Sequence, residues 1–119
     1  MSEVKFFYIR NRWPTPENPR RGDPIGCIAY ERYEDPDVEG TEYVLYDLSI
    51  ASPKDEFSKR RAREIAKGRL DSNKILNSVH ATTDDKSSAV VGLILQDIAT
   101  QLVVPKRVRK ACEAWHACK

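Results

Sequence analysis

The residues best suited to chemistry in this chain are the arginines of the segment 52–70, SPKDEFSKRRAREIAKGRL. On a helical wheel of about 100° per residue, Arg61 and Arg69 fall on the same arc as the apolar residues of a predicted helix. A guanidinium stays charged in proteins, so one turned toward an apolar surface needs a carboxylate, a carbonyl or an anionic ligand. Gly68 leaves room beside Arg69 for a ligand or a second backbone. The pattern predicts that Arg61 and Arg69 bind either a phosphate group or acidic side chains of this chain.

A second pair of candidate arginines lies in the last segment, PKRVRKACEAWHACK. Arg107 falls at the border of the apolar face of a predicted helix, and Arg109 points away from that face. The first turn of such a helix also presents free N–H groups that suit phosphate. Arg107 and Arg109 are therefore predicted either to bind phosphate or to belong to a solvated basic helix end.

Aromatic residues gather in the first 46 residues of the chain, where most are expected to be strand core. In a sheet with one open face, some of them can instead form a platform on which a base stacks. We select Phe7 and Tyr46 as the base-stacking candidates.

Several other kinds of chemistry have no support in the sequence. The chain contains no glycine-rich phosphate loop of Walker or Rossmann type, and no nucleophile stands in a recognised arrangement with His80 or His116. Cys112 and His116 are one helical turn apart, but no second pair completes a metal site. We expect no catalytic residue, no metal and no cofactor, and three reduced cysteines, Cys27, Cys112 and Cys118.

Charge is divided along the chain, although the formal net charge is only +2. Acidic residues exceed basic ones by six in 31–47, whereas basic residues exceed acidic ones by four in 54–69 and again by four in 105–119. This division suits a focused anion site, or self-association of acidic and basic surfaces, better than a uniformly basic nucleic-acid surface.

Composition indicates one globular domain over residues 1–119, with 40% hydrophobic and 32% charged residues. No apolar run approaches the ~20 residues of a membrane span, and the N-terminus lacks the apolar segment of a signal peptide. We therefore expect a cytoplasmic protein with no membrane contact.

The expected fold is α+β, with a three-stranded antiparallel meander followed by three helices. The strands are predicted within residues 4–50, at 4–10, 25–33 and 42–50, and a proline-rich loop covers 13–24. Helices are predicted at 53–70, 86–103 and 105–117, the first with Ser52 as N-cap and Asp55 completing a capping box. The segment 71–85 is predicted to be a polar connection.

The predicted helix within 89–104 is the main core element, because its apolar residues cover about half of the helical wheel. It packs on the sheet or on a second subunit. Its apolar arc, together with Leu93, exceeds what a three-stranded sheet covers easily, so we expect a homo-oligomer.

Residues 43–70 resemble small bacteriophage proteins. In this pattern a strand ending YDLSIA is followed by the elements SPKD, F, K, R, IA and GR. The chain is also similar to the phage Thoeris anti-defence sponges, which are small oligomeric proteins that sequester cyclic ADP-ribose signals without cleaving them. The resemblance implies a phosphate-gripping site at a subunit interface, built from Arg61, Arg69, Arg107 and Arg109.

Our leading hypothesis is a non-enzymatic phage anti-defence protein that sequesters a small cyclic nucleotide immune signal, such as a cyclic ADP-ribose isomer, in the host cytosol. The first alternative is an inhibitor or adaptor that binds a host protein through the acidic hairpin around 31–47. The second alternative is nucleic-acid binding through both basic helices, which the acidic hairpin disfavours.

Overall fold

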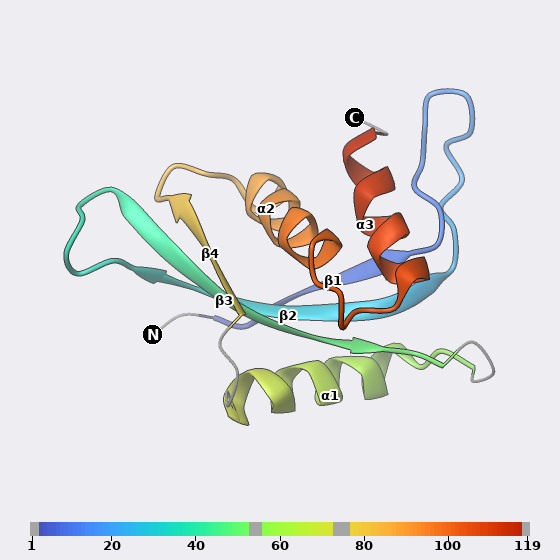
Figure 1. Cartoon of the computed structure of the whole chain (residues 1–119), viewed down its shortest axis with the longest axis horizontal. Helices are drawn as coiled ribbons and strands as arrows, with labels where there is room; N and C mark the ends of the chain where they lie inside the picture. Colours follow the sequence, from blue (N-terminus) through green and yellow to red (C-terminus); the bar gives the residue numbers. More distant parts are fainter. Residues whose placement is uncertain (1–2, 53–55, 73–76, 118–119) are drawn as a thin grey trace.

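The computed structural model describes residues 3–52, 56–72 and 77–117, and its fold is α+β (Figure 1). Three strands come first in the chain, and a helix, a fourth strand and two further helices follow. In chain order they are β1 Lys5–Arg10, β2 Pro24–Glu34, β3 Thr41–Ile50, α1 Lys59–Ser72, β4 Asn77–Thr82, α2 Ser87–Ala99 and α3 Lys106–Ala117.

All four strands form one antiparallel sheet in the order β1-β2-β3-β4. The prediction of three strands followed by three helices is therefore wrong, because β4 lies between α1 and α2 in the chain and extends the meander. Val79 and Ala81 of β4 turn inward, whereas Ser78, His80 and Thr82 are exposed. An edge strand with one open face needs few apolar residues, so its polar sequence looks like a loop.

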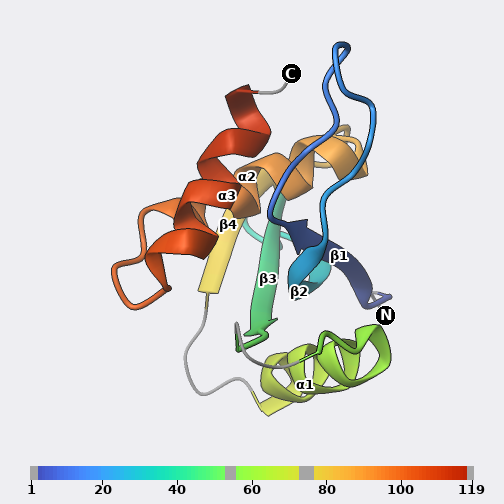
Figure 2. The ribbon, with the colours of Figure 1, turned by 90° about the vertical axis from the view of Figure 1, so that its right-hand side faces the viewer.

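Helices cover both faces of the sheet, with α1 on one face and α2 and α3 on the other (Figure 2). The larger core lies under α2 and α3, where alternate strand residues such as Ile28, Val44 and Tyr46 meet Val90 and Ile94. The smaller core lies under α1. Its buried members are all small or aliphatic: Cys27, Ala29, Ala62, Ala66 and Leu70.

Helix α1 begins later than predicted, at Lys59. The Ser58 hydroxyl accepts a hydrogen bond from the Arg61 N–H at 3.4 Å, as an N-cap does. Phe57, just before the cap, meets the Tyr8 ring edge-on at a centroid distance of 6.2 Å, which fixes how the chain enters the helix. Ser52, the predicted N-cap, therefore lies before the helix and does not cap it, and Asp55 lies outside the described residues.

Helix α2 also ends earlier than predicted, at Ala99. The Thr100 N–H donates to the Asp97 carbonyl at 3.1 Å, and a turn then connects to α3. Leu102 and Val103 in that turn are 84% and 91% exposed, before Val104 returns to the core. Helix α3 nearly matches the predicted span 105–117.

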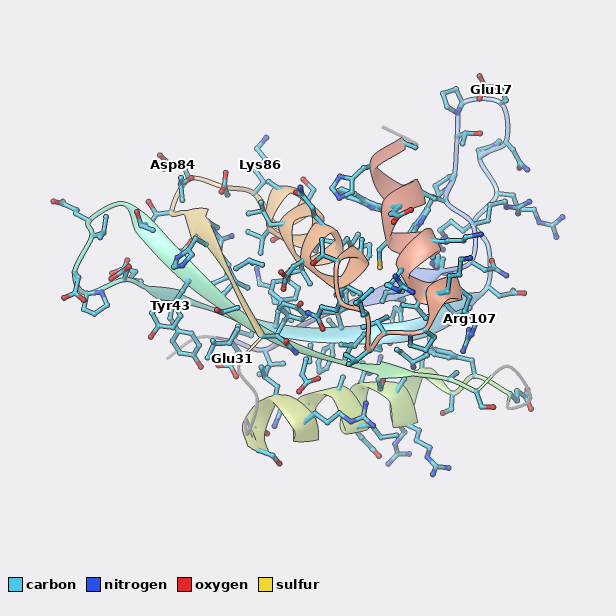
Figure 3. All side chains as sticks on the ribbon, in the orientation of Figure 1. Glu17, Glu31, Tyr43, Asp84, Lys86 and Arg107 are labelled. Carbon is cyan, nitrogen blue, oxygen red and sulfur yellow. The ribbon has the colours of Figure 1, made fainter. Side chains whose placement is uncertain are left out.

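Two segments project from opposite ends of the molecule (Figure 1). The β2–β3 hairpin carries seven of the 18 acidic residues, and Glu31 and Tyr43 lie on its α1 side (Figure 3). At the other end, the loop 11–23 extends beside α3. None of the described helices has the length and apolar character that crossing a lipid bilayer requires.

Candidate functional site

The most distinctive arrangement of side chains lies between β1, the loop 11–23 and α3. The rings of Phe7 on β1 and Trp13 in the loop stack with centroids 5.8 Å apart and planes 21° apart. The Trp13 indole N–H donates to the Ala111 carbonyl of α3 at 2.7 Å. Trp13 is 7% exposed, so this hydrogen bond holds its ring in one orientation against the core.

These rings border an open pocket of about 360 Å³, which we call the aromatic pocket. Its third ring is Trp115, which is half-buried on α3. A Cβ atom at position 92 of α2 would lie 2.9 Å from the Trp115 ring, so Gly92 lets this ring pack against the α2 backbone. The lining residues are Phe7, Tyr8, Arg10, Trp13, Pro14, Arg21 and Trp115.

Two guanidinium groups complete the aromatic pocket. Arg10 donates to the Gly22 carbonyl at 2.9 Å and thereby ties the end of β1 to the far side of the loop. Arg21 is exposed and forms no ion pair with any residue in the described ranges. The pocket therefore offers flat apolar surfaces together with positive hydrogen-bond donors, which suits a planar ring that carries an anionic group.

Arg61, predicted to face the apolar side of α1, is exposed. It lines a second open depression of about 430 Å³ between the end of β3 and α1, together with Ser49, Ser52 and Ser58. The Ser49 hydroxyl already donates to the Ala62 carbonyl at 2.8 Å. This depression has a positive group and hydroxyls, but Phe57 is the one aromatic residue in its described lining.

Arg69 is also exposed, and its guanidinium binds the backbone rather than a carboxylate. It donates to the Leu48 carbonyl at 2.8 Å. The β3–β4 register ends at Tyr46 and Asn77, so Leu48 lies on the stretch of β3 that β4 leaves uncovered. The Leu48 N–H donates to the Asp47 carboxylate at 2.8 Å. Arg69 and Asp47 thus provide hydrogen-bond partners for the carbonyl and the N–H of Leu48 at this exposed strand edge.

The two arginines predicted on α3 also contact carbonyls. Arg107 donates to Ala51, and Arg109 donates to Val104 at 3.1 Å. Arg107 lies near the start of α3, beside the end of β3 (Figure 3). The four predicted arginines do not converge on one site: Arg61 and Arg107 border neighbouring depressions around Ala51, while Arg69 and Arg109 serve the β3 edge and the α2–α3 turn.

The two predicted base-stacking residues have different surroundings. Phe7 is half-buried and lines the aromatic pocket. Tyr46 is 1% exposed, and its ring lies inside the larger core with no exposed face to offer a base. Its hydroxyl donates to Asp97 at 2.5 Å and accepts from the Gln101 amide at 2.6 Å. Burial, followed by the bond to Asp97, raises the pKa of Tyr46.

The described ranges contain no group of three histidine, cysteine or acidic side chains that could hold a metal ion. Cys27 and Cys112 are buried free thiols, and burial raises the pKa of Cys27 to about 11. His116 contacts the edge of Trp115 at a centroid distance of 4.9 Å, and His80 lies on β4.

Sequence reasoning missed Arg10, Arg21, Trp13 and Trp115 as site residues. Trp13 lies in the predicted proline-rich loop 13–24, and Trp115 lies in the predicted helix 105–117. One signal was present: four arginines, at positions 10, 12, 20 and 21, flank the prolines of the loop beside a tryptophan. Interleaved arginine and aromatic residues are typical of nucleotide and nucleic-acid sites.

Comparison of this chain with protein-family models, curated proteins and solved structures gives no match in any of the three.

Proposed function

We propose that this protein binds a small nucleotide in the aromatic pocket and does not transform it. The observation that carries the proposal is the convergence of Phe7, Trp13 and Trp115 with Arg10 and Arg21 around one pocket of about 360 Å³. Pockets that hold small molecules generally have volumes of roughly 300 to 1,000 Å³. A single nucleobase with its sugar suits the lower end of that range.

The chemistry of the pocket matches the two halves of a nucleotide. Bases stack on aromatic faces whatever their sequence identity, because every base has a π-face. Arginine binds phosphate with charge-assisted hydrogen bonds and a planar fork of donors. The stacked Phe7 and Trp13 and the half-buried Trp115 supply the apolar surfaces. Arg21 and the unused donors of Arg10 supply the positive charge.

Binding without turnover is proposed from the groups that line the pocket. Among the described residues around it there is no carboxylate, imidazole or thiol, and the one hydroxyl, that of Tyr8, accepts a hydrogen bond from Arg63 at 3.1 Å. General acid–base and nucleophilic catalysis on a nucleotide normally use such groups. The pocket is therefore better suited to holding a ligand than to cleaving it.

The biological role in the proposal comes from the resemblance to phage anti-defence proteins. On that basis the ligand is a nucleotide immune signal, such as a cyclic ADP-ribose isomer, that the protein sequesters in the host cytosol. We also propose a homo-oligomer, and the adjacent, almost fully exposed Leu102 and Val103 are the residues that a second copy would cover.

Mass spectrometry of retained small molecules tests this proposal. The purified protein is incubated with a pool of cyclic nucleotides, nucleoside phosphates and ADP-ribose isomers, separated from free ligand and denatured. Recovery of one unmodified nucleotide supports the proposal. Recovery of a modified product contradicts the absence of turnover, and the retention of no nucleotide contradicts the proposed function as a whole.

A specific observation favours a second candidate, the binding of a basic host protein. Tyr33 and Tyr43 stack on the sheet face beyond α1, with centroids 5.6 Å apart, and the Tyr33 hydroxyl donates to Glu31 at 2.5 Å. Tyrosine faces beside carboxylates suit arginine and lysine side chains. Exchange of Asp35, Asp37 and Glu39 for lysine separates the candidates, since partner binding should be lost while nucleotide binding persists.

A further inference from the structure

Another depression, distinct from the one beside Arg61, adjoins the aromatic pocket and shares Arg21 with it. It lies within the loop 11–23 and has a volume of about 590 Å³. We call it the arginine basin, since three of its lining residues are Arg12, Arg20 and Arg21. The other lining residues are Asn11, Asn18, Gly22 and Asp23.

The two sides of the loop hold the basin in shape by pairing with each other. The Gly22 N–H donates to the Arg12 carbonyl at 3.0 Å, and the Asn11 N–H donates to the Asp23 carbonyl at 3.0 Å. The Asn11 side chain accepts from the Asp23 N–H at 2.9 Å. A Cβ atom at position 22 would lie 2.6 Å from the Arg12 nitrogen, so the two sides can approach this closely only because residue 22 is glycine.

The charges of the basin are unbalanced. Arg12, Arg20 and Arg21 are exposed, and none of them forms an ion pair with any residue in the part of the chain that the structure describes. Asp23 is the one carboxylate among the described lining residues. Three exposed like charges around one constrained loop create a positive potential that attracts an anion.

The position of the basin relative to the aromatic pocket suggests which anion it takes. Arg21 lines both depressions, so a ligand whose base stacks on Phe7 and Trp115 has its first phosphate near Arg21. Any further phosphate then extends toward Arg12 and Arg20. The loop tip beyond them carries Glu17 (Figure 3), which limits the positive surface to the basin. This arrangement favours a compact free nucleotide over a long polyanion.

We propose that the arginine basin is a phosphate subsite and that the ligand is a nucleotide with at least two phosphates. This inference rests on the proposed nucleotide function of the aromatic pocket and adds the number of phosphates and two further binding residues, Arg12 and Arg20, beside the shared Arg21.

Isothermal titration calorimetry tests the inference with three sets of probes: the common ribonucleosides, their 5′-monophosphates and their 5′-diphosphates. The preferred diphosphate should bind wild-type protein at least about tenfold more tightly than its monophosphate, because charge-assisted hydrogen bonds to the second phosphate are added. The double variant Arg12→Ala/Arg20→Ala should bind the diphosphate no more tightly than the monophosphate, with its monophosphate affinity unchanged.

Arg60→Ala/Lys67→Ala is the matched control, because it removes the same charge from the exposed side of α1, where, among the described residues, the two side chains pair only with Glu64 and Asp71. It should preserve the preference for the diphosphate. Both double variants remove exposed side chains, and thermal melts verify that they fold.

Each contrary outcome has a distinct meaning. Equal affinity of wild-type protein for monophosphate and diphosphate overturns the phosphate subsite and leaves the proposed function standing. An equal loss of affinity in both double variants shows general charge attraction and also overturns the subsite. If neither these probes nor the cyclic nucleotides and ADP-ribose isomers of the retention assay bind, the proposed function fails. If only single-stranded oligonucleotides bind, the free-nucleotide ligand is excluded.

Discussion

Phe7 and Trp13 stack with their ring centroids 5.8 Å apart, although one lies on a strand and the other in a proline-rich loop. The stack lies between the sheet and α3, because the Trp13 indole N–H binds the Ala111 carbonyl of that helix. One side chain thus connects the loop, the core and the aromatic pocket. The proposed ligand site therefore depends on the same contacts that hold the loop 11–23 in place.

Trp13→Phe should lower the free energy of unfolding by about 1 to 3 kcal/mol, because it removes a buried hydrogen bond and part of a core ring. Urea unfolding followed by circular dichroism measures this change. Tyr8→Phe is the control, since it removes only an exposed contact with Arg63 at 3.1 Å. Equal stability of the Trp13 variant and wild-type protein would show that the indole N–H does not stabilise the fold.

Tyr46→Phe should lower the free energy of unfolding by about 1 to 3 kcal/mol without changing nucleotide affinity. The substitution leaves the Asp97 carboxylate and the Gln101 amide without their shared hydroxyl partner. Denaturant unfolding and calorimetry measure the two quantities. Tyr33→Phe removes a similar bond to Glu31 nearer the surface and should cost less. A loss of nucleotide affinity in the Tyr46 variant would contradict a purely structural role of the hydroxyl, because phenylalanine keeps the ring.

Arg69→Ala distinguishes a structural role from the phosphate-binding role predicted from the sequence. Its guanidinium binds the Leu48 carbonyl at the uncovered edge of β3, so we expect a loss of about 0.5 to 1 kcal/mol in stability and unchanged nucleotide affinity. Thermal melts and calorimetry, with Arg60→Ala as the exposed control, provide the comparison. Loss of nucleotide binding at an unchanged melting temperature would support the sequence prediction.

Stability should fall as the pH rises above about 9. Burial raises the pKa of the Cys27 thiol from 9.0 to about 11, and burial also raises the pKa of the Cys112 thiol to about 12. The folded protein then keeps protons that the unfolded chain has lost, so ionisation favours unfolding over this interval. Urea midpoints from neutral to alkaline pH should decline less steeply in Cys27→Ala/Cys112→Ala. A decline of equal slope would exclude these thiols as its cause.

Strand alternation and the main core helix were predictable from the sequence because each is a local pattern with a strong apolar signal. Val44, Tyr46 and Leu48 alternate along β3, and all three are buried. Val90, Ile94 and Ile98 follow the helical period on α2 and are fully buried. Strand β4 was missed because only Val79 and Ala81 carry its inward pattern.

The helical wheel predicted the buried face of α1 only in part. The wheel placed Ile65 on the buried arc beside Arg61 and Arg69, but Ile65 is 38% exposed and both arginines are exposed. The wheel also placed Ala62, Ala66 and Leu70 on that arc, and these three residues do face the sheet, where Ala62 and Ala66 are buried against Cys27 and Ala29. A helix that packs closely on a sheet needs small residues at the contact, and hydrophobicity alone gives these little weight.

The aromatic pocket could not be assembled from the sequence, apart from Phe7. Its rings come from β1, from the loop after it and from α3, and these segments meet only through tertiary packing. The Trp13 hydrogen bond to a helix carbonyl leaves no spacing signal in the chain. The pairing of the loop 11–23 with itself likewise depends on backbone contacts between distant residues.

The most direct test of nucleotide binding in the aromatic pocket is the affinity of the recovered nucleotide for Phe7→Leu and Trp115→Leu, measured by isothermal titration calorimetry. Leucine keeps apolar bulk but removes the stacking surface, and Phe57→Leu on the opposite face of the sheet serves as the control. We predict a loss of at least about tenfold in affinity for both pocket variants and wild-type affinity for the control, while thermal melts verify that each variant folds. Wild-type affinity in both folded pocket variants would contradict nucleotide binding at this site.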